Sequence, residues 1–163
     1  MLSTAGDKQF SATEKKLLQA ITTLTQQAPS NRILLILDDP TPLLTITNTA
    51  TSQTLSTLLL TLRSQPKIHS TLLCIPSDLP FLSASPITPL ETDLAAFAVQ
   101  QAHLARTVMG VRELGTGAAK DISGVLRVTR GGGGGFDDRE REEVREMESL
   151  YLVGRDGGVK MVE

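Results

Sequence analysis

The sequence predicts an α/β protein in which helices flank a mixed β-sheet. Two short, uninterrupted apolar runs, ILLIL and STLLCI, are typical of parallel strands that are buried on both faces. Segments with apolar residues at helical spacing lie before, between and after these runs. Strand-like segments then follow one another towards the carboxyl end, which predicts antiparallel additions to the sheet.

The first helix is expected to begin at Ser11, after a disordered start over residues 1–10. Ser11 and Glu14 have the spacing of a capping box, in which each side chain bonds the backbone N–H of the other residue. Apolar residues at helical spacing follow, and Pro29 is expected to end the helix. The apolar stripe of this helix consists of Leu17, Leu18, Ile21 and Leu24.

The two apolar runs are predicted to be strands that have helices on both faces. Asp38 ends the first strand, and Cys74, within the second, is expected to be a small buried residue. Residues 41–50 are expected to form a loop. Residues 51–65 are expected to form a helix whose apolar face holds Leu55, Leu58, Leu59 and Leu62.

A further helix is expected to begin at the motif TPLE. Thr88 is the predicted cap, Pro89 takes the first helical position, and Glu91 reaches back to the cap. The predicted apolar face of this helix consists of Leu90, Leu94, Phe97, Ala98 and Ala102.

The remainder of the chain is predicted to consist of strands and flexible segments. RTVMGVREL and GVLRVTR predict two strands joined by a glycine-bearing loop. The glycine run and the charged run DDREREEVREMES that follow predict a flexible break and a solvated helix or extended arm, over residues 131–149. LYLVGRDGGVKMV predicts a closing hairpin, with Asp-Gly as the turn that two-residue loops prefer.

The composition excludes several classes of protein. Aromatic residues make up 3% of the chain and Trp is absent, so a stacking platform for single-stranded nucleic acid is not expected. Cys74 is the single cysteine, which excludes an intrachain disulfide and a cysteine-based zinc site. The amino terminus has no apolar signal core, and ILLIL is too short to cross a bilayer, so we expect a soluble intracellular protein.

The stretch RELGTGAAKDISG raises the question of nucleotide binding. A phosphate loop requires GxxxxGK[ST], because backbone amides, the lysine and the hydroxyl together hold phosphates and magnesium. Gly110 and Gly115 have the required glycine spacing, but Thr116 stands where the lysine must be, and Lys120 is followed by Asp121. The stretch also comes late in the chain, between two predicted strands. We therefore predict a tight loop here and not a phosphate site.

Asp38 resembles the acid that holds magnesium-bound water in P-loop ATPases, because it ends an apolar strand. Such an acid acts on a bound nucleotide, and only one predicted helix precedes this strand. Asp38 is therefore interpreted as a strand-end or capping residue in a vestigial position. No catalytic residue, cofactor or metal ligand is predicted.

Four strings resemble the fungal Elongator complex protein 6 family. They are ILLILDDP, LRSQPKIHSTLLCIPSDLPFL, TPLETDLAAFAVQQAHLARTVMGVRELGTGAAKDISGVLRVTRGG and LYLVGRDGGVKMV. The most specific part is LGTGAAKDISGVLRVTRGG, since it covers a loop and a strand in one register. The resemblance extends over residues 32–162.

This resemblance implies a RecA-like domain that has lost its phosphate loop, a pseudo-ATPase and not an enzyme. It also implies a hetero-hexameric ring with the Elongator sister proteins four and five, joined to the remaining Elongator subunits in the cytoplasm and nucleus. Elongator modifies the wobble uridine of certain tRNAs, and tRNA contact by this chain is expected to be indirect or weak. Family members carry further elements before the equivalent of Ser11, so residues 11–163 are expected to be a single, partial RecA-like domain.

Positive charge gathers in residues 106–130, where Lys120, Arg127 and Arg130 are candidate contacts to sister subunits or tRNA. Arg127 and Arg130 are three residues apart on one predicted strand, so they are expected to face opposite sides of the sheet. Three interpretations remain open. These residues are exposed charges that form salt bridges between subunits, they contact tRNA phosphates, or one arginine reaches a neighbouring nucleotide site.

Two other functions remain open on the sequence alone. One is an active RecA-like ATPase whose phosphate loop lies upstream of this chain. The other is a scaffold or chaperone-like α/β module with no role in tRNA modification.

Overall fold

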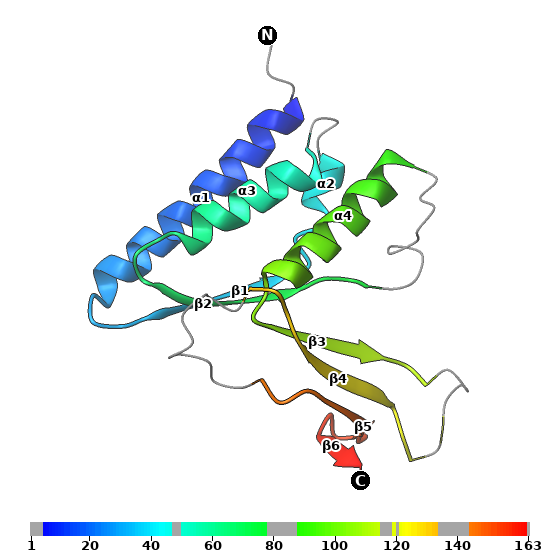
Figure 1. Cartoon of the computed structure of the whole chain (residues 1–163). Helices are drawn as coiled ribbons and strands as arrows, with labels where there is room; N and C mark the ends of the chain where they lie inside the picture. The colour runs from blue at the N-terminus through cyan, green and yellow to red at the C-terminus, as the bar shows by residue number, and fades with distance from the viewer. Residues whose placement is uncertain are drawn as a thin grey trace. The chain divides into compact units, whose positions relative to one another are not determined.

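The computed structural model describes residues 5–46, 50–77, 88–114, 119, 121–133 and 144–162 (Figure 1). The chain divides into two units, Met1–Val99 and Gln100–Glu163, which are described separately. The helices are α1 (Ala5–Gln27), α2 (Leu43–Ile46), α3 (Ser52–Arg63) and α4 (Pro89–Leu104). The strands are β1 (Ile33–Asp38), β2 (Ile68–Cys74), β3 (Thr107–Arg112), β4 (Gly124–Arg130), β5 (Met147–Val153) and β6 (Val159–Val162).

The predicted α/β class is confirmed, but the expectation of one mixed sheet is wrong for the described residues. β1 and β2 form a two-stranded parallel sheet, and β3, β4, β5 and β6 form a four-stranded antiparallel sheet in that order. The way in which the strands are joined explains the difference. Helix α3 lies between β1 and β2 in the chain and provides the crossover that parallel strands need. No helix is described between β3 and β6, and consecutive strands there pair directly.

The core of the first unit lies between the β1–β2 sheet and its helices. Helices α1 and α3 lie on the same side of the two strands (Figure 1). Fully burying a leucine or phenylalanine side chain contributes about 1.5–3 kcal/mol, so this cluster is the main source of stability in the unit. The buried cluster consists of Ile21, Leu44, Leu55, Leu58, Leu59, Leu62 and Phe97.

The opposite side of this sheet is exposed, so the prediction of helices on both faces is wrong for the described residues. Alternate side chains of β1 point away from the helices, and Leu34 and Ile36 are 56% and 58% exposed. Leu72 on β2 is 48% exposed. Cys74, expected to be buried, is also exposed. Side chains alternate between the two faces of a strand, and Cys74 at the end of β2 lies on the exposed face.

Helix α1 begins at Ala5, so the predicted start at Ser11 is wrong. Ser11 lies inside the helix and cannot cap it. Phe10 packs against the buried cluster, which gives the earlier turns a tertiary contact that capping-box spacing does not reveal. The predicted end before Pro29 is confirmed, since the helix finishes at Gln27. The expected loop at 41–50 contains the short helix α2.

The predicted capping box at the start of α4 is confirmed. The backbone N–H of Thr88 donates to Glu91 Oε2 at 2.9 Å, and the N–H of Glu91 donates to Thr88 Oγ1 at 3.2 Å. The helix begins at Pro89, as predicted. Only part of its predicted apolar face is buried, since Phe97 is fully buried whereas Leu90 is 38% exposed.

The predicted closing hairpin is confirmed, with a longer strand and a longer loop. Strand β5 begins at Met147, inside the segment expected to be flexible. The N–H of Gly154 donates to the carbonyl of Gly158 at 2.8 Å, so three residues form the loop and not two. Gly157 has a φ of 79°, which suits the left-handed position of a three-residue hairpin loop. Residues 134–143 of the predicted flexible segment lie outside the described residues.

The first glycines of the glycine run are ordered against the end of α4, which corrects part of the predicted flexible break. The N–H of Gly131 donates to the carbonyl of Arg106 at 3.0 Å, and the N–H of Gly133 donates to the carbonyl of Ala105 at 2.9 Å. A Cβ atom on Gly131 would overlap the Ala105 carbonyl oxygen. The absence of a side chain therefore lets the glycine backbone come close enough to donate hydrogen bonds to the carbonyls of Ala105 and Arg106, which directly follow α4.

Candidate interaction surfaces

The carboxyl end of the β1–β2 sheet holds the acid that the sequence singles out. Asp38 is the exposed last residue of β1 and pairs in register with Cys74, so its predicted position at a strand end is confirmed. Asp39, the next residue, has a φ of 44°, an uncommon value for a residue other than glycine. Its N–H donates to the Cys74 carbonyl at 3.0 Å, which ties the turn to the neighbouring strand.

The Asp39 carboxylate is occupied by local hydrogen bonds. Its Oδ1 accepts from the backbone N–H of Thr41 at 3.2 Å and also from the Thr41 hydroxyl. Thr41 is buried, so these bonds satisfy a polar side chain that packing has removed from water. Within the described residues, no group of three or more His, Cys, Asp or Glu side chains is placed to hold a metal ion.

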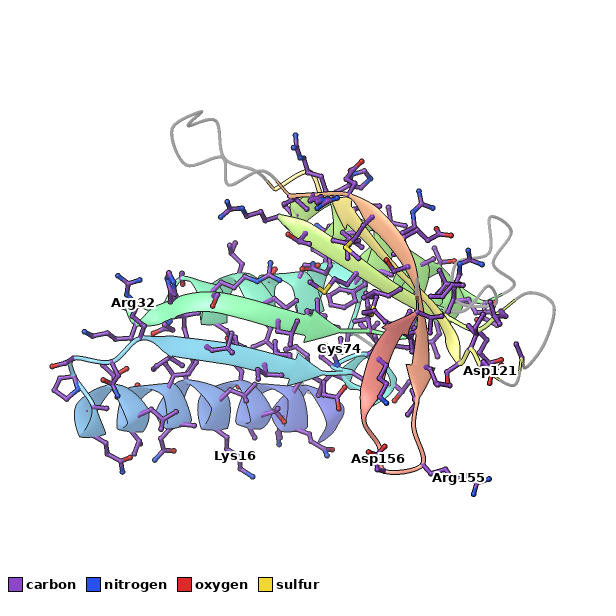
Figure 2. All side chains as sticks on the ribbon, turned by 90° about the horizontal axis from the view of Figure 1, so that it is seen from below. Lys16, Arg32, Cys74, Asp121, Arg155 and Asp156 are labelled. Carbon is purple, nitrogen blue, oxygen red and sulfur yellow. The ribbon has the colours of Figure 1, made fainter. Side chains whose placement is uncertain are left out.

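The amino end of the same sheet carries positive charge. Arg32 lies at this end, away from Cys74 (Figure 2), and its Nη1 is 3.4 Å from Nε2 of His69. Arg63 ends α3, and burial lowers the pKa of its guanidinium. The Nε of Arg63 is buried without a hydrogen-bond partner among the described atoms. The first unit therefore separates basic groups at one end of its sheet from acidic groups at the other.

The structure places two of the three predicted contact residues in the second unit. Arg127 pairs with Gly110 on β3 and with Glu148 on β5, and Arg130 pairs with Thr107 at the end of β4. Both arginines are exposed, and their three-residue separation on one strand points them to opposite faces, as predicted. They cannot form one flat basic patch. Lys120 lies outside the described residues.

One face of the β3–β4–β5–β6 sheet carries several charged residues beside apolar ones, of which Val125 is 4% exposed. We call it the charged sheet face, and its charged residues are Arg112, Arg127, Glu148 and Lys160. Arg112 Nη2 is 3.2 Å from Glu148 Oε1, with side chains 60% and 50% exposed. An ion pair so exposed contributes at most about 1 kcal/mol. Among the described residues, neither Arg127 nor Lys160 forms an ion pair.

The other face of this sheet is apolar and exposed. We call it the apolar sheet face, and the strand register assigns to it Met109, Val111, Leu126, Val128, Met147, Tyr151, Val153, Val159 and Met161. Six of these side chains are 41–65% exposed, with Met109 at 65% and Val111 at 64%. Such a run of exposed apolar side chains marks an interaction surface. The sequence prediction missed this surface, although the alternation of apolar residues along each strand is the signal that would have located it.

A cavity of about 550 Å³ lies where β4 ends and the chain enters β5. Arg130, Val144, Arg145 and Glu146 line it among the described residues. The Glu146 carboxylate already accepts the N–H of Arg130 at 3.0 Å. Two guanidinium groups beside a carboxylate that is already hydrogen-bonded suit a polar contact with a partner surface.

Comparisons with known proteins add no family assignment. Neither the scan against protein-family models nor the search among curated proteins produced a match. None of the helices in the described part of the chain is long and apolar enough to cross a membrane.

Proposed function

We propose that this chain is a non-catalytic structural subunit of the Elongator complex. In this role it joins the sister proteins four and five in a RecA-like hetero-hexameric ring that is required for modification of the tRNA wobble uridine. The observation that carries the proposal is the string LGTGAAKDISGVLRVTRGG, which resembles the Elongator complex protein 6 family over a loop and a strand. The ring acts in the cytoplasm and nucleus, where the remaining Elongator subunits supply the chemistry.

The exposed apolar surfaces support a role inside an assembly. Leu34, Ile36 and Leu72 are exposed on one unit, and the apolar sheet face is exposed on the other. A protein that works alone covers most of such surface, whereas a subunit buries it against its neighbours. The acids Asp38 and Asp39 end a strand and hold a turn, which supports a structural role for this end of the sheet.

Arg127 and Arg130, together with Lys120, are the proposed contacts to sister subunits or tRNA. Arg127 is exposed on the charged sheet face, and Arg130 borders the cavity at the end of β4. Since the two arginines face opposite sides, we expect them to serve different partners. An arginine that loses a phosphate contact weakens RNA binding and reduces its salt dependence, whereas one that loses a subunit contact weakens assembly.

Co-expression with sister proteins four and five tests the proposal directly. We expect the three proteins to purify as one stoichiometric complex, and native mass spectrometry to give the mass of a hexamer with two copies of each. The matched control is co-expression of the two sisters without this chain, which should not yield that mass. A chain that stays apart from both sisters, while those two associate with each other, would refute the proposal.

A further inference from the structure

The apolar sheet face is the largest unexplained feature of the second unit. Six large apolar residues of this face are exposed, and the strand register places all six on the same side of the sheet. They come from β3, β5 and β6, so the surface extends across the whole sheet. These residues are Met109, Val111, Met147, Val153, Val159 and Met161.

The exposed area is of the size that a stable dimer needs. Together these residues present on the order of 600 Å² of surface, at the upper end of the range for the largest apolar patch on a monomeric protein. Leu126, Val128 and Tyr151 lie partly buried between them on the same face. A standard interface buries about 800 Å² on each partner, so the six exposed residues would supply most of that area.

The charge on this face decides which partner fits. Within the four strands, the only charged residue on this side is Arg130, at the end of β4. Nucleic acid is a poor partner, because phosphate binding needs several cations. A charged protein surface is also a poor partner, since its charges would be buried without counterparts. Two copies of the face, in contrast, can meet without burying a charge at the centre.

The geometry also suits a second copy. Antiparallel sheets pack face to face about 10 Å apart, with strands within about 30° of each other, and both inner faces contribute alternate side chains. A two-fold axis lets the same apolar patch meet itself, which closes the assembly at a dimer. The unbranched side chains of Met109, Met147 and Met161 adapt to an irregular opposing surface.

We propose that the apolar sheet face binds a second copy of this chain, so that the isolated protein is an isologous dimer. The proposal concerns the chain without sister subunits, and it stands or falls separately from the Elongator assignment. The hairpin tip, with Arg155 and Asp156 (Figure 2), lies beyond the paired strands and stays outside the proposed contact.

Sedimentation velocity of the full chain, over a hundredfold range of micromolar concentration, tests the proposal with a matched pair of variants. Val111→Glu places a carboxylate on the apolar sheet face. Gly110→Glu adds the same side chain to the same strand on the charged sheet face, where a Cβ atom meets nothing within 4 Å and Arg127 is the cross-strand neighbour. We expect the wild type and Gly110→Glu to be dimers. We expect Val111→Glu to associate at least about a hundredfold more weakly, because the interface would bury an unpaired charge.

A second pair on β6 keeps the test decisive if Val111→Glu fails to fold, as judged by circular dichroism. Met161→Glu alters the apolar sheet face, and Lys160→Glu alters the neighbouring residue on the charged sheet face. We expect only Met161→Glu to yield monomers. A monomeric wild type, an open series of larger species, or dimers that survive both apolar-face substitutions would overturn the proposal.

Discussion

Single residues in this chain act mainly through backbone geometry. Asp39 adopts a positive φ at the end of β1 and bonds Thr41 through its carboxylate. Gly157 adopts a positive φ in the hairpin loop. Gly131 and Gly133 bring their N–H groups against carbonyls at the end of α4, where a side chain on Gly131 would collide with the backbone. At each of these positions the backbone conformation or a close backbone contact accounts for the residue.

Gly131→Ala is expected to destabilise the second unit by about 1–3 kcal/mol, because the new methyl group forces the backbone away from α4 and breaks the bond to Arg106. Urea denaturation measures this change. Gly110→Ala is the matched control, since its Cβ meets nothing within 4 Å and alanine costs less conformational entropy than glycine in a strand. Equal unfolding midpoints for the two variants would show that Gly131 has no packing role.

At the scale of elements, α3 and β1 are each packed through one face. Helix α3 shows this most clearly, because neighbouring leucines differ completely in burial. Leu59 is 1% exposed and belongs to the core cluster, whereas Leu60 is 68% exposed. Strand β1 shows the same pattern, with Leu35 packed against the core and Leu34 exposed. The exposed faces of α3 and β1 are therefore available to a partner.

Leu59→Ala is expected to lower the free energy of unfolding by about 2–5 kcal/mol, because it removes buried methylene groups and leaves a cavity. Leu60→Ala makes the same chemical change one residue along α3 and is expected to alter that free energy by less than about 0.5 kcal/mol. Thermal and urea denaturation of the two variants provide the comparison. A loss of stability at Leu60 as large as that at Leu59 would mean that the exposed face of α3 is covered in solution.

The elements that the sequence predicts correctly are those with a local cause. The capping box of Thr88 and Glu91 lies within four residues, and the α4 start follows from it. The predicted start of α1 at Ser11 is wrong because Phe10 packs against the distant core cluster, a contact that no local motif encodes. Strand pairing and the exposure of side chains also depend on distant residues, so local patterns do not predict the separation into two sheets or the exposed face of β1. Of the candidate contacts, the opposite orientation of Arg127 and Arg130 follows from strand alternation alone.

At the scale of the whole molecule, both units leave apolar sheet surface uncovered. The first unit exposes Leu34, Ile36 and Leu72, and the second exposes the apolar sheet face. This uncovered apolar surface is the observation that supports the proposed role in an assembly.

The proposed role in tRNA modification is best tested by the level of modified wobble uridine in tRNA, measured by mass spectrometry of digested tRNA from a deletion strain and from complemented strains. We expect loss of the modification on deletion, full recovery with the wild-type gene, and equal recovery with Asp38→Asn, because we propose a structural role for Asp38 at the end of β1. Unchanged modification in the deletion strain would contradict the Elongator assignment. Recovery with the wild type but not with a stably expressed Asp38→Asn would contradict the non-catalytic role and favour an active ATPase.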